Sequence, residues 1–167
     1  MERIDSFLLH GPETAQGLTA GDWEVWREME ALQAEGRVRL LGISNVTAEQ
    51  LQALLDGARR SPAFVQNRCY VKMGLDRAVR QVCRQHGIVY QGFSLLTANR
   101  ALWGDRRLHP MARRMGGTPA QVMFCFARQS GVLPLTGTTD PVHMRAALAS
   151  LQMQLTEAEM QELSGRA

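Results

Sequence analysis

The sequence predicts an α/β fold in which five parallel strands alternate with helices. Short apolar runs of strand length recur along the 167 residues. Between these runs, apolar residues fall at the three- and four-residue steps of an amphipathic helix. The runs are continuous rather than alternating with polar residues, which is typical of strands buried on both faces of a parallel sheet. Helices are then expected to cover that sheet, because the connections between parallel strands carry them.

The first three strands are predicted at residues 4–9, 38–43 and 63–67. A helix is expected over 22–35, where apolar residues follow the helical period and Gly36 ends it. A second helix is expected to begin after Thr47, because Thr47 and Gln50 have the spacing of a capping box.

Two further strands are predicted at residues 88–94 and 132–136. A helix is expected before residue 88. The residues with helical spacing that line it are the apolar Leu75, Val79, Val82 and Cys83, together with His86. Residues 97–117 are expected to form one long irregular connection. Helices are then expected to follow the cap Thr118-Pro119, over 141–151, and from Thr156, whose partner Glu159 completes another capping box.

Composition excludes several classes of protein. The net charge is +3 and the pI about 9.1, but the arginines are scattered rather than gathered on one helix, so no nucleic-acid binding is expected. No apolar run approaches the roughly 18 residues of a membrane span, and no signal-peptide layout is present, so a cytoplasmic location is expected. Cys83 and His86 lack a second pair of metal ligands, so no metal site is predicted.

The predicted strands end in polar or aromatic residues. These residues are His10, Ser44-Asn45, Gln66 and Phe93-Ser94, and the last strand is followed by Gly137-Thr138-Thr139. Carboxyl ends of parallel strands share one edge of a sheet, where ligands bind in α/β proteins. Amide side chains there suit a carboxamide, an aromatic ring suits a pyridine ring, and a turn into a helix suits a phosphate. Taken singly, each feature is also explained by ordinary capping and turn chemistry.

Six segments, in order along the chain, resemble the aldo-keto reductase family. They are Asp5-Ser6-Phe7-Leu8-Leu9-His10-Gly11-Pro12, Gly36-Arg37-Val38-Arg39-Leu40-Leu41-Gly42-Ile43-Ser44-Asn45, Val65-Gln66-Asn67, Gly92-Phe93-Ser94-Leu95-Leu96, Thr118-Pro119-Ala120-Gln121 and Val132-Leu133-Pro134-Leu135-Thr136-Gly137-Thr138. The resemblance implies a (β/α)8 TIM barrel that reduces carbonyls with NADPH, or less often NADH. Residues 1–167 are then expected to form a single partial barrel domain.

The resemblance implies roles on the substrate and nicotinamide side. His10 would orient and polarise the substrate carbonyl. Ser44, Asn45 and Gln66 would hold the nicotinamide carboxamide. Phe93 stands where the family usually has a tyrosine stacked on the nicotinamide, so it keeps the ring and loses the hydroxyl.

The resemblance also implies a phosphate side of the cofactor site. Ser94 and Leu96 would lie along the pyrophosphate. Gly137, Thr138 and Thr139 would face the adenosine phosphate. The substrate cannot be inferred, because the resemblance supplies only part of the expected pocket.

The match begins at the family's fourth barrel strand, so the first three βα units have no counterpart. Those units carry the family's catalytic aspartate, tyrosine and lysine, and neither Lys72, Tyr70 nor Tyr90 stands in an equivalent place. Two functions remain open: an aldo-keto reductase portion that is not catalytic alone, and a truncated non-catalytic paralogue that binds a nucleotide or a protein. Either chain would leave strand edges exposed, so self-association or a covering partner is expected.

Overall fold

The computed structural model describes residues 3–102 and 104–165. Its residues group into two compact units, which are described separately. Unit 1 comprises Met1–Asn67 and Ala78–Gln91, and unit 2 comprises Arg68–Arg77 and Gly92–Ala167.

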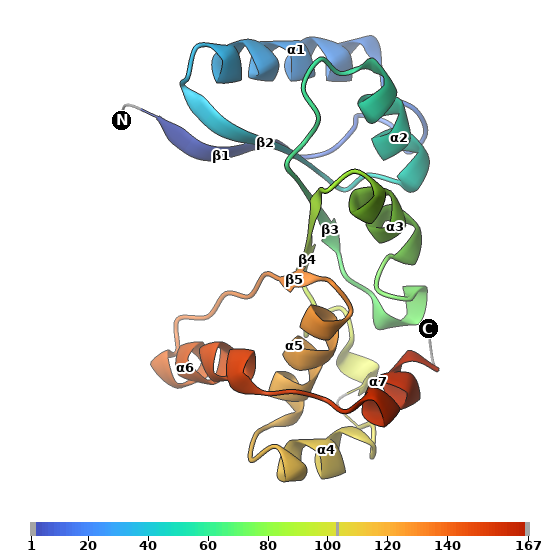
Figure 1. Cartoon of the computed structure of the whole chain (residues 1–167), viewed down its shortest axis with the longest axis vertical. Coiled ribbons are helices and arrows are strands. Elements are labelled where there is room, and N and C mark those ends of the chain that lie inside the picture. The colour runs from blue at the N-terminus through green and yellow to red at the C-terminus, as the bar shows by residue number, and fades with distance from the viewer. Residues whose placement is uncertain (1–2, 103, 166–167) are drawn as a thin grey trace. The chain divides into compact units, whose positions relative to one another are not determined.

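Strands and helices alternate as predicted. Up to the fourth strand the elements are β1 (Ile4–Leu9), α1 (Ala20–Ala34), β2 (Val38–Ser44), α2 (Ala48–Gly57), β3 (Phe64–Arg68), the 3-10 turn η1 (Val71–Met73), α3 (Arg77–Gln85) and β4 (Val89–Phe93) (Figure 1). The remaining elements are η2 (Arg100–Leu102), α4 (Leu108–Arg114), α5 (Pro119–Gln129), β5 (Leu133–Pro134), α6 (Pro141–Ala149), η3 (Ser150–Gln152) and α7 (Glu157–Ser164).

The strands form one sheet in the order β1-β2-β3-β4-β5. The β1–β2 and β2–β3 pairs are parallel, with Leu8 opposite Gly42 and Ser44 opposite Gln66. The α/β fold with five parallel strands is therefore confirmed, and β1 and β5 are its edge strands as expected. This register brings the carboxyl ends of β2 and β3 level with each other.

Each unit has its own apolar core. In unit 1, α1 packs on β1 and β2, and the buried side chains include Trp26, Leu41, Leu51 and Val65. In unit 2, α5 is buried on every side from Gln121 to Ala127, and α4, α6 and β5 pack against it (Figure 1). A helix that is apolar all round belongs in the middle of a core, and α5 takes that place in unit 2.

The predicted helix caps are present. Thr47 and Gln50 exchange side-chain to backbone hydrogen bonds at the start of α2, and Thr156 and Glu159 do the same at α7. Two further capping boxes were not predicted as such. Thr118, the predicted cap of α5, forms one with Gln121. Thr19 and Asp22 form the other at α1, so this helix begins at Ala20, earlier than the predicted residue 22.

Several predicted boundaries are wrong. Residues 97–117 are not one irregular connection, because Leu108, Met111 and Ala112 bury one face of α4 there. The last strand is shorter than 132–136, since β5 spans only Leu133–Pro134.

The predicted lining of the α3 helix is also corrected. Leu75 precedes the helix, with a positive φ of 54°, and so it cannot be a helical residue. His86 is exposed just beyond the end of α3, whereas Cys83 is buried as expected.

Apolar side chains are exposed in both units. Phe7 of β1 is 39% exposed in unit 1. In unit 2, Leu148 and Leu151 are 67% and 56% exposed, and no residue of α6 is buried. None of the helices that the structure describes is both long and apolar enough to cross a lipid bilayer.

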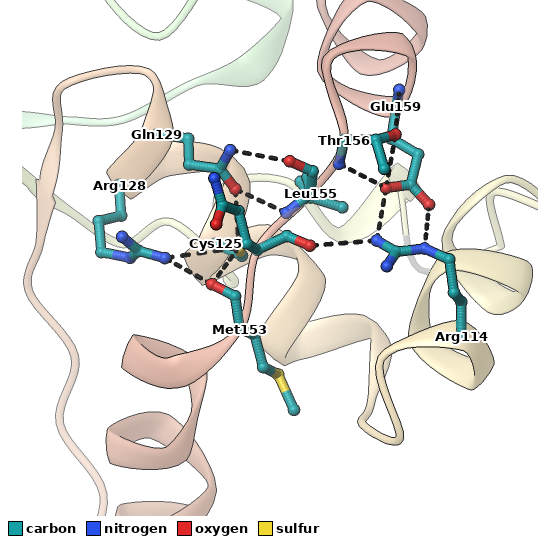
Figure 2. A network of polar contacts seen from close by, with 9 residues as sticks. Arg114, Cys125, Arg128, Gln129, Met153, Leu155, Thr156 and Glu159 are labelled. Atoms are coloured by element: carbon teal, nitrogen blue, oxygen red, sulfur yellow. Dashed lines mark hydrogen bonds and ion pairs between the residues drawn. The ribbon is translucent and has the colours of Figure 1, made fainter.

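A polar network holds the C-terminal segment of unit 2 (Figure 2). Gln129 of α5 donates from Nε2 to the Leu155 carbonyl at 3.0 Å and accepts the Leu155 N–H at 2.7 Å. Arg114 of α4 binds both carboxylate oxygens of Glu159, at 2.8 and 2.6 Å. This bidentate hydrogen bond lowers the pKa of the Glu159 carboxyl and raises that of the Arg114 guanidinium. The start of α7 is therefore fixed on α4 by paired charges.

Candidate functional site

The end of β2 is joined to the end of β3 by hydrogen bonds to one carbonyl. The Ser44 hydroxyl, in a residue only 2% exposed, donates to the backbone oxygen of Gln66. The Asn45 N–H donates to the same oxygen at 3.1 Å. The Gln66 carbonyl thereby accepts two hydrogen bonds. It holds Ser44, the last residue of β2, and Asn45, the residue after it.

Asn45 links this point to His10. Its φ is 54°, a left-handed conformation that asparagine tolerates better than most residues. The Asn45 Nδ2 group donates to the backbone oxygen of His10 at 2.7 Å. Both side chains are exposed. The structure thus brings His10, Ser44, Asn45 and Gln66 together in unit 1, and we call them the strand-end cluster.

Gln66 has a side-chain partner that the sequence did not reveal. Its Nε2 group donates to Oε1 of Gln91 on β4 at 3.2 Å, and both side chains are partly buried. The sequence offered one signal for this pair: two successive predicted strands carry an amide residue, Gln66 and Gln91, at the same position along the strand. Gln91 limits the orientations open to the Gln66 amide, and so it is a second residue of interest.

Asn67 supports the loop that follows the strand-end cluster. This buried residue accepts the Val46 N–H on Oδ1 at 3.1 Å and donates from Nδ2 to the Val46 carbonyl at 2.8 Å. Both backbone groups of Val46 are therefore satisfied by one side chain. The segment between Asn45 and the cap of α2 is held in place without a regular element of its own.

Unit 2 contains an open pocket beside the end of β4. Its volume is about 400 Å³, within the range of small-molecule sites. It is lined by Phe93, Ser94, Leu95, Leu96, Thr97, Phe124, Leu135, Thr136 and Gly137. Four residues predicted for the cofactor, namely Phe93, Ser94, Leu96 and Gly137, thus face one hollow.

Glycine at position 92 allows the strands of this pocket to approach. The Leu135 N–H donates to the Gly92 carbonyl at 2.8 Å, which pairs the segment after β5 with β4. A Cβ on Gly92 would come within 2.7 Å of a Val132 methyl and 3.0 Å of the Cys69 Cβ. Only a residue without a side chain fits between these neighbours.

The turn after β4 is fixed by Ser94 and Asn99. Ser94 has a φ of 55°, and its carbonyl accepts the Ala98 N–H at 2.8 Å. The buried Asn99 side chain accepts from Val71 N at 2.8 Å and donates to the carbonyls of Cys69 and Leu95, at 2.8 and 2.6 Å. One side chain thus ties residues 69–71 to the turn after β4, next to the pocket.

Phe93 is also in contact with a cation. The Arg68 guanidinium lies over its ring, 5.7 Å from the centroid. A guanidinium in this position is attracted to the negative face of the ring. Phe93 therefore has a defined contact in unit 2 besides its place in the pocket wall.

The residues predicted for the adenosine phosphate do not all lie in the same environment. Thr138 lines two further hollows of unit 2, of about 440 and 570 Å³, which share Phe124, Thr136 and Gly137 with the first pocket. Thr139 is exposed and lies outside the linings of these pockets.

The N-terminus of α6 is already capped. Asp140 accepts the Val142 N–H at 2.7 Å, and its own N–H donates to the Thr138 hydroxyl at 3.1 Å. A carboxylate thus meets the positive end of this helix. Within residues 3–102 and 104–165, no group of three His, Cys, Asp or Glu side chains is arranged to hold a metal ion.

The comparisons with known proteins agree on one family. The model of the aldo/keto reductase family matches residues 1–165. The (1S)-1,7-diacetoxy-luvungin A aldo-keto reductase of Citrus sinensis is 29% identical over 98% of this chain and 56% of that protein. The D-galacturonate reductase of Fragaria ananassa is 31% identical over 98% of this chain and 57% of that protein.

Solved structures show the same fold. An aldo-keto reductase from a Medee basin deep-sea metagenome library superposes with a TM-score of 0.89, at 18% identity, over 99% of this chain and 60% of that one. Gox0644 in its apo form superposes with a TM-score of 0.87, at 25% identity, over 99% of this chain and 59% of that one. The chain therefore spans less than two thirds of the length of these relatives.

Proposed function

The chain belongs to the aldo/keto reductase family, and from this membership we propose that it binds a nicotinamide dinucleotide, NADPH in preference to NADH. The observation that supports the proposal is the pocket of unit 2, whose lining includes Phe93, Ser94, Leu96 and Gly137. We assign the pyrophosphate to Ser94 and Leu96 and the stacking contact to Phe93. When bound, the dinucleotide would supply the hydride for reduction of a carbonyl.

The residues present fit such a group. The pocket wall combines the apolar surfaces of Phe93 and Phe124 with hydroxyls of Ser94, Thr97 and Thr136. A flat ring requires apolar surface, and phosphate oxygens require donors. Gly137 has nothing within 4 Å of an added Cβ, so the wall is open there.

The strand-end cluster of unit 1 has the groups that a carboxamide and a carbonyl require. We assign the carboxamide to Ser44, Asn45 and Gln66 and the substrate carbonyl to His10. The hydroxyl of Ser44 has an oxygen that accepts as well as donates, and Gln66 has both amide groups. Gln91 acts as the positioning residue for Gln66, because it already binds the Gln66 Nε2 group.

We further propose that the 167-residue chain reduces no carbonyl by itself. The chain spans 56 to 58% of the length of its curated relatives. No residue of this sequence takes the place of the tyrosine acid and lysine that the resemblance leaves without a counterpart. His10 orients a carbonyl but does not replace that proton source.

An NADPH fluorescence titration tests the binding proposal. The purified chain is expected to show saturable binding at micromolar NADPH, with weaker binding of NADH. The substitution Gly137→Leu fills the pocket from a position with free space around it, and it should weaken binding at least about tenfold. Gly104→Leu is the matched control, because Gly104 of unit 2 also has nothing within 4 Å of an added Cβ. Equal binding by wild type and Gly137→Leu would contradict the proposal.

A second function, as a protein-interaction module, is favoured by the exposed apolar residues of β5, α6 and η3. Leu133, Leu148 and Leu151 are all at least half exposed, and Leu133 lies on an edge strand. Edge strands and exposed apolar faces are surfaces that associate. We propose self-association or a partner that covers this face. Sedimentation velocity is expected to show an oligomer that Leu148→Lys with Leu151→Lys disrupts, and a monomeric wild type would exclude self-association.

A further inference from the structure

Unit 1 contains a hollow of about 480 Å³ at the other end of the strands from the strand-end cluster. Its walls are the second half of α1 and the segment that joins α2 to β3, which runs beside α1 in Figure 1. These segments lead into the amino ends of β2 and β3, whereas the cluster lies at the carboxyl ends. The residues that line the hollow are Arg27, Glu30, Ala31, Ala34, Arg59 and Arg60. We call it the arginine pocket.

The shape of the arginine pocket follows from helical spacing. Arg27, Glu30, Ala31 and Ala34 occupy positions i, i+3, i+4 and i+7 of α1, so they share one face of this helix. The two alanines end at Cβ and leave room beside the longer side chains. The Arg60 N–H donates to Glu30 Oε1 at 2.8 Å, and Glu30 is only 6% exposed. That bond fixes the loop with Arg59 and Arg60 against the helix.

The charge of the arginine pocket is unbalanced. Three arginines and one glutamate line the pocket, and the carboxylate of that Glu30 already accepts a backbone donor. None of these arginines takes part in an ion pair within the described part of the chain. Arg27 lies over the Trp23 ring, 5.8 Å from its centroid, which restricts the position of its guanidinium. The wall therefore presents exposed cations with unused N–H donors.

We propose that the arginine pocket binds a small multivalent oxyanion of the phosphate class. Arginine presents N–H donors in a planar fork that matches phosphate oxygens two at a time. Two adjacent arginines on a fixed loop, together with a third on a helix, provide donors from more than one direction. The ligand is held outside the nicotinamide site, so its binding does not depend on the proposed function.

Isothermal titration calorimetry with sodium pyrophosphate, at constant ionic strength and on the full chain, tests this proposal. The wild type is expected to bind one pyrophosphate saturably, at submillimolar concentrations. The double substitution Arg59→Gln with Arg60→Gln should weaken binding at least about tenfold. Arg37→Gln with Arg84→Gln removes the same charge from exposed positions elsewhere in unit 1, and it should change the affinity less than about twofold.

A neutral substitution separates a shaped pocket from general positive charge. Ala31→Leu fills the hollow and leaves every arginine in place, and it should weaken pyrophosphate binding as strongly as the arginine pair. Ala31 is exposed, so folding is unaffected, and Ala53→Leu on α2 is the matched exposed control. The proposal is overturned by an absence of saturable binding in the wild type. It is equally overturned if Arg37→Gln with Arg84→Gln, or Ala53→Leu, weakens binding as much as the pocket variants do. NADPH affinity, measured separately, should be unchanged in all these variants.

Discussion

The candidate site residues of the two units differ in how far the fold already uses their polar atoms. In unit 1, Ser44, Asn45 and Gln66 are hydrogen-bonded to one another or to a neighbouring strand. In unit 2, Phe93 and Gly137 line an open pocket. Their contribution to binding would come from the shape of its wall rather than from side-chain hydrogen bonds. Substitutions in the strand-end cluster will therefore change stability as well as binding. Substitutions in the pocket wall will change binding with less effect on stability.

Both units share one structural device, a buried asparagine that replaces regular hydrogen bonding in a loop. Asn67 binds the N–H and carbonyl of Val46 in unit 1. Asn99 binds Val71, Cys69 and Leu95 in unit 2. Asn67 ties the loop after β2 to β3, and Asn99 ties residues 69–71 to the turn after β4. Both asparagines should therefore be needed for stability.

The largest expected effect is the loss of Asn99. Asn99→Ala leaves one buried N–H and two buried carbonyls without their partner and should lower the free energy of unfolding by about 2–4 kcal/mol. Asn67→Ala removes two buried hydrogen bonds to Val46 and should cost about 1–3 kcal/mol. Urea unfolding of both variants measures the two losses, with the exposed Gln154→Ala as control. A loss no larger than that of the control, in either variant, would contradict the role assigned to that asparagine.

The sequence predicted the parts of the fold that depend on local pattern. The strands, the alternation and the caps at Thr47 and Thr156 follow from periods and short motifs that neighbouring residues determine. The α4 helix was missed because Arg and Pro residues interrupt its apolar pattern, and its buried face is defined only by packing in unit 2. The predicted last strand was too long because the residues on either side of Leu133–Pro134 are also apolar, whereas β5 itself spans only these two residues.

The candidate site was predictable at the level of residues near strand ends, but not at the level of contacts. The sequence places an amide on each of two strands but does not show that Gln66 binds Gln91, because the two meet only when the sheet forms. The same holds for Arg68 over the ring of Phe93. Long-range side-chain pairs depend on register and rotamer, which a local pattern does not contain.

The next largest effect concerns the Gln66–Gln91 pair in unit 1. Gln66→Ala should weaken NADPH binding by about 1–3 kcal/mol, because it removes the hydrogen bond that we propose between Gln66 and the carboxamide. Gln91→Ala should weaken it less, since Gln91 only orients the Gln66 amide. Fluorescence titration of both variants and of the double variant measures their coupling, and the double variant should bind no more weakly than Gln66→Ala. Full additivity would show that the two residues act separately.

His10 provides a smaller effect within the same cluster. Its contact with Asn45 uses the backbone oxygen, so His10→Ala preserves that bond and removes only an exposed side chain. NADPH affinity should therefore change less than about twofold. A loss as large as that of Gln66→Ala would move His10 from the substrate side to the cofactor side. Asn45→Ala is the variant to compare with His10→Ala, because it removes the hydrogen bond to the His10 backbone oxygen that His10→Ala preserves.

The smallest expected effect is a difference between the two units in how local stability depends on pH. Unit 1 ties its loop to Asn67 with a neutral amide, whereas unit 2 ties α7 to α4 through Glu159 and Arg114. The hydrogen bond from Arg114 holds the pKa of the Glu159 carboxyl below its unfolded value. The stabilisation is therefore complete above the unfolded pKa of a glutamate and is lost as the pH falls through the lowered folded pKa. On acidification the protection factors for hydrogen exchange, which correct for the slower intrinsic exchange in acid, should fall in α7 before they fall in α2. Glu159→Gln should show low protection of α7 already at pH 7. A parallel loss of protection in α2 and α7 of the wild type would mean that acid acts on both units alike rather than through this ion pair.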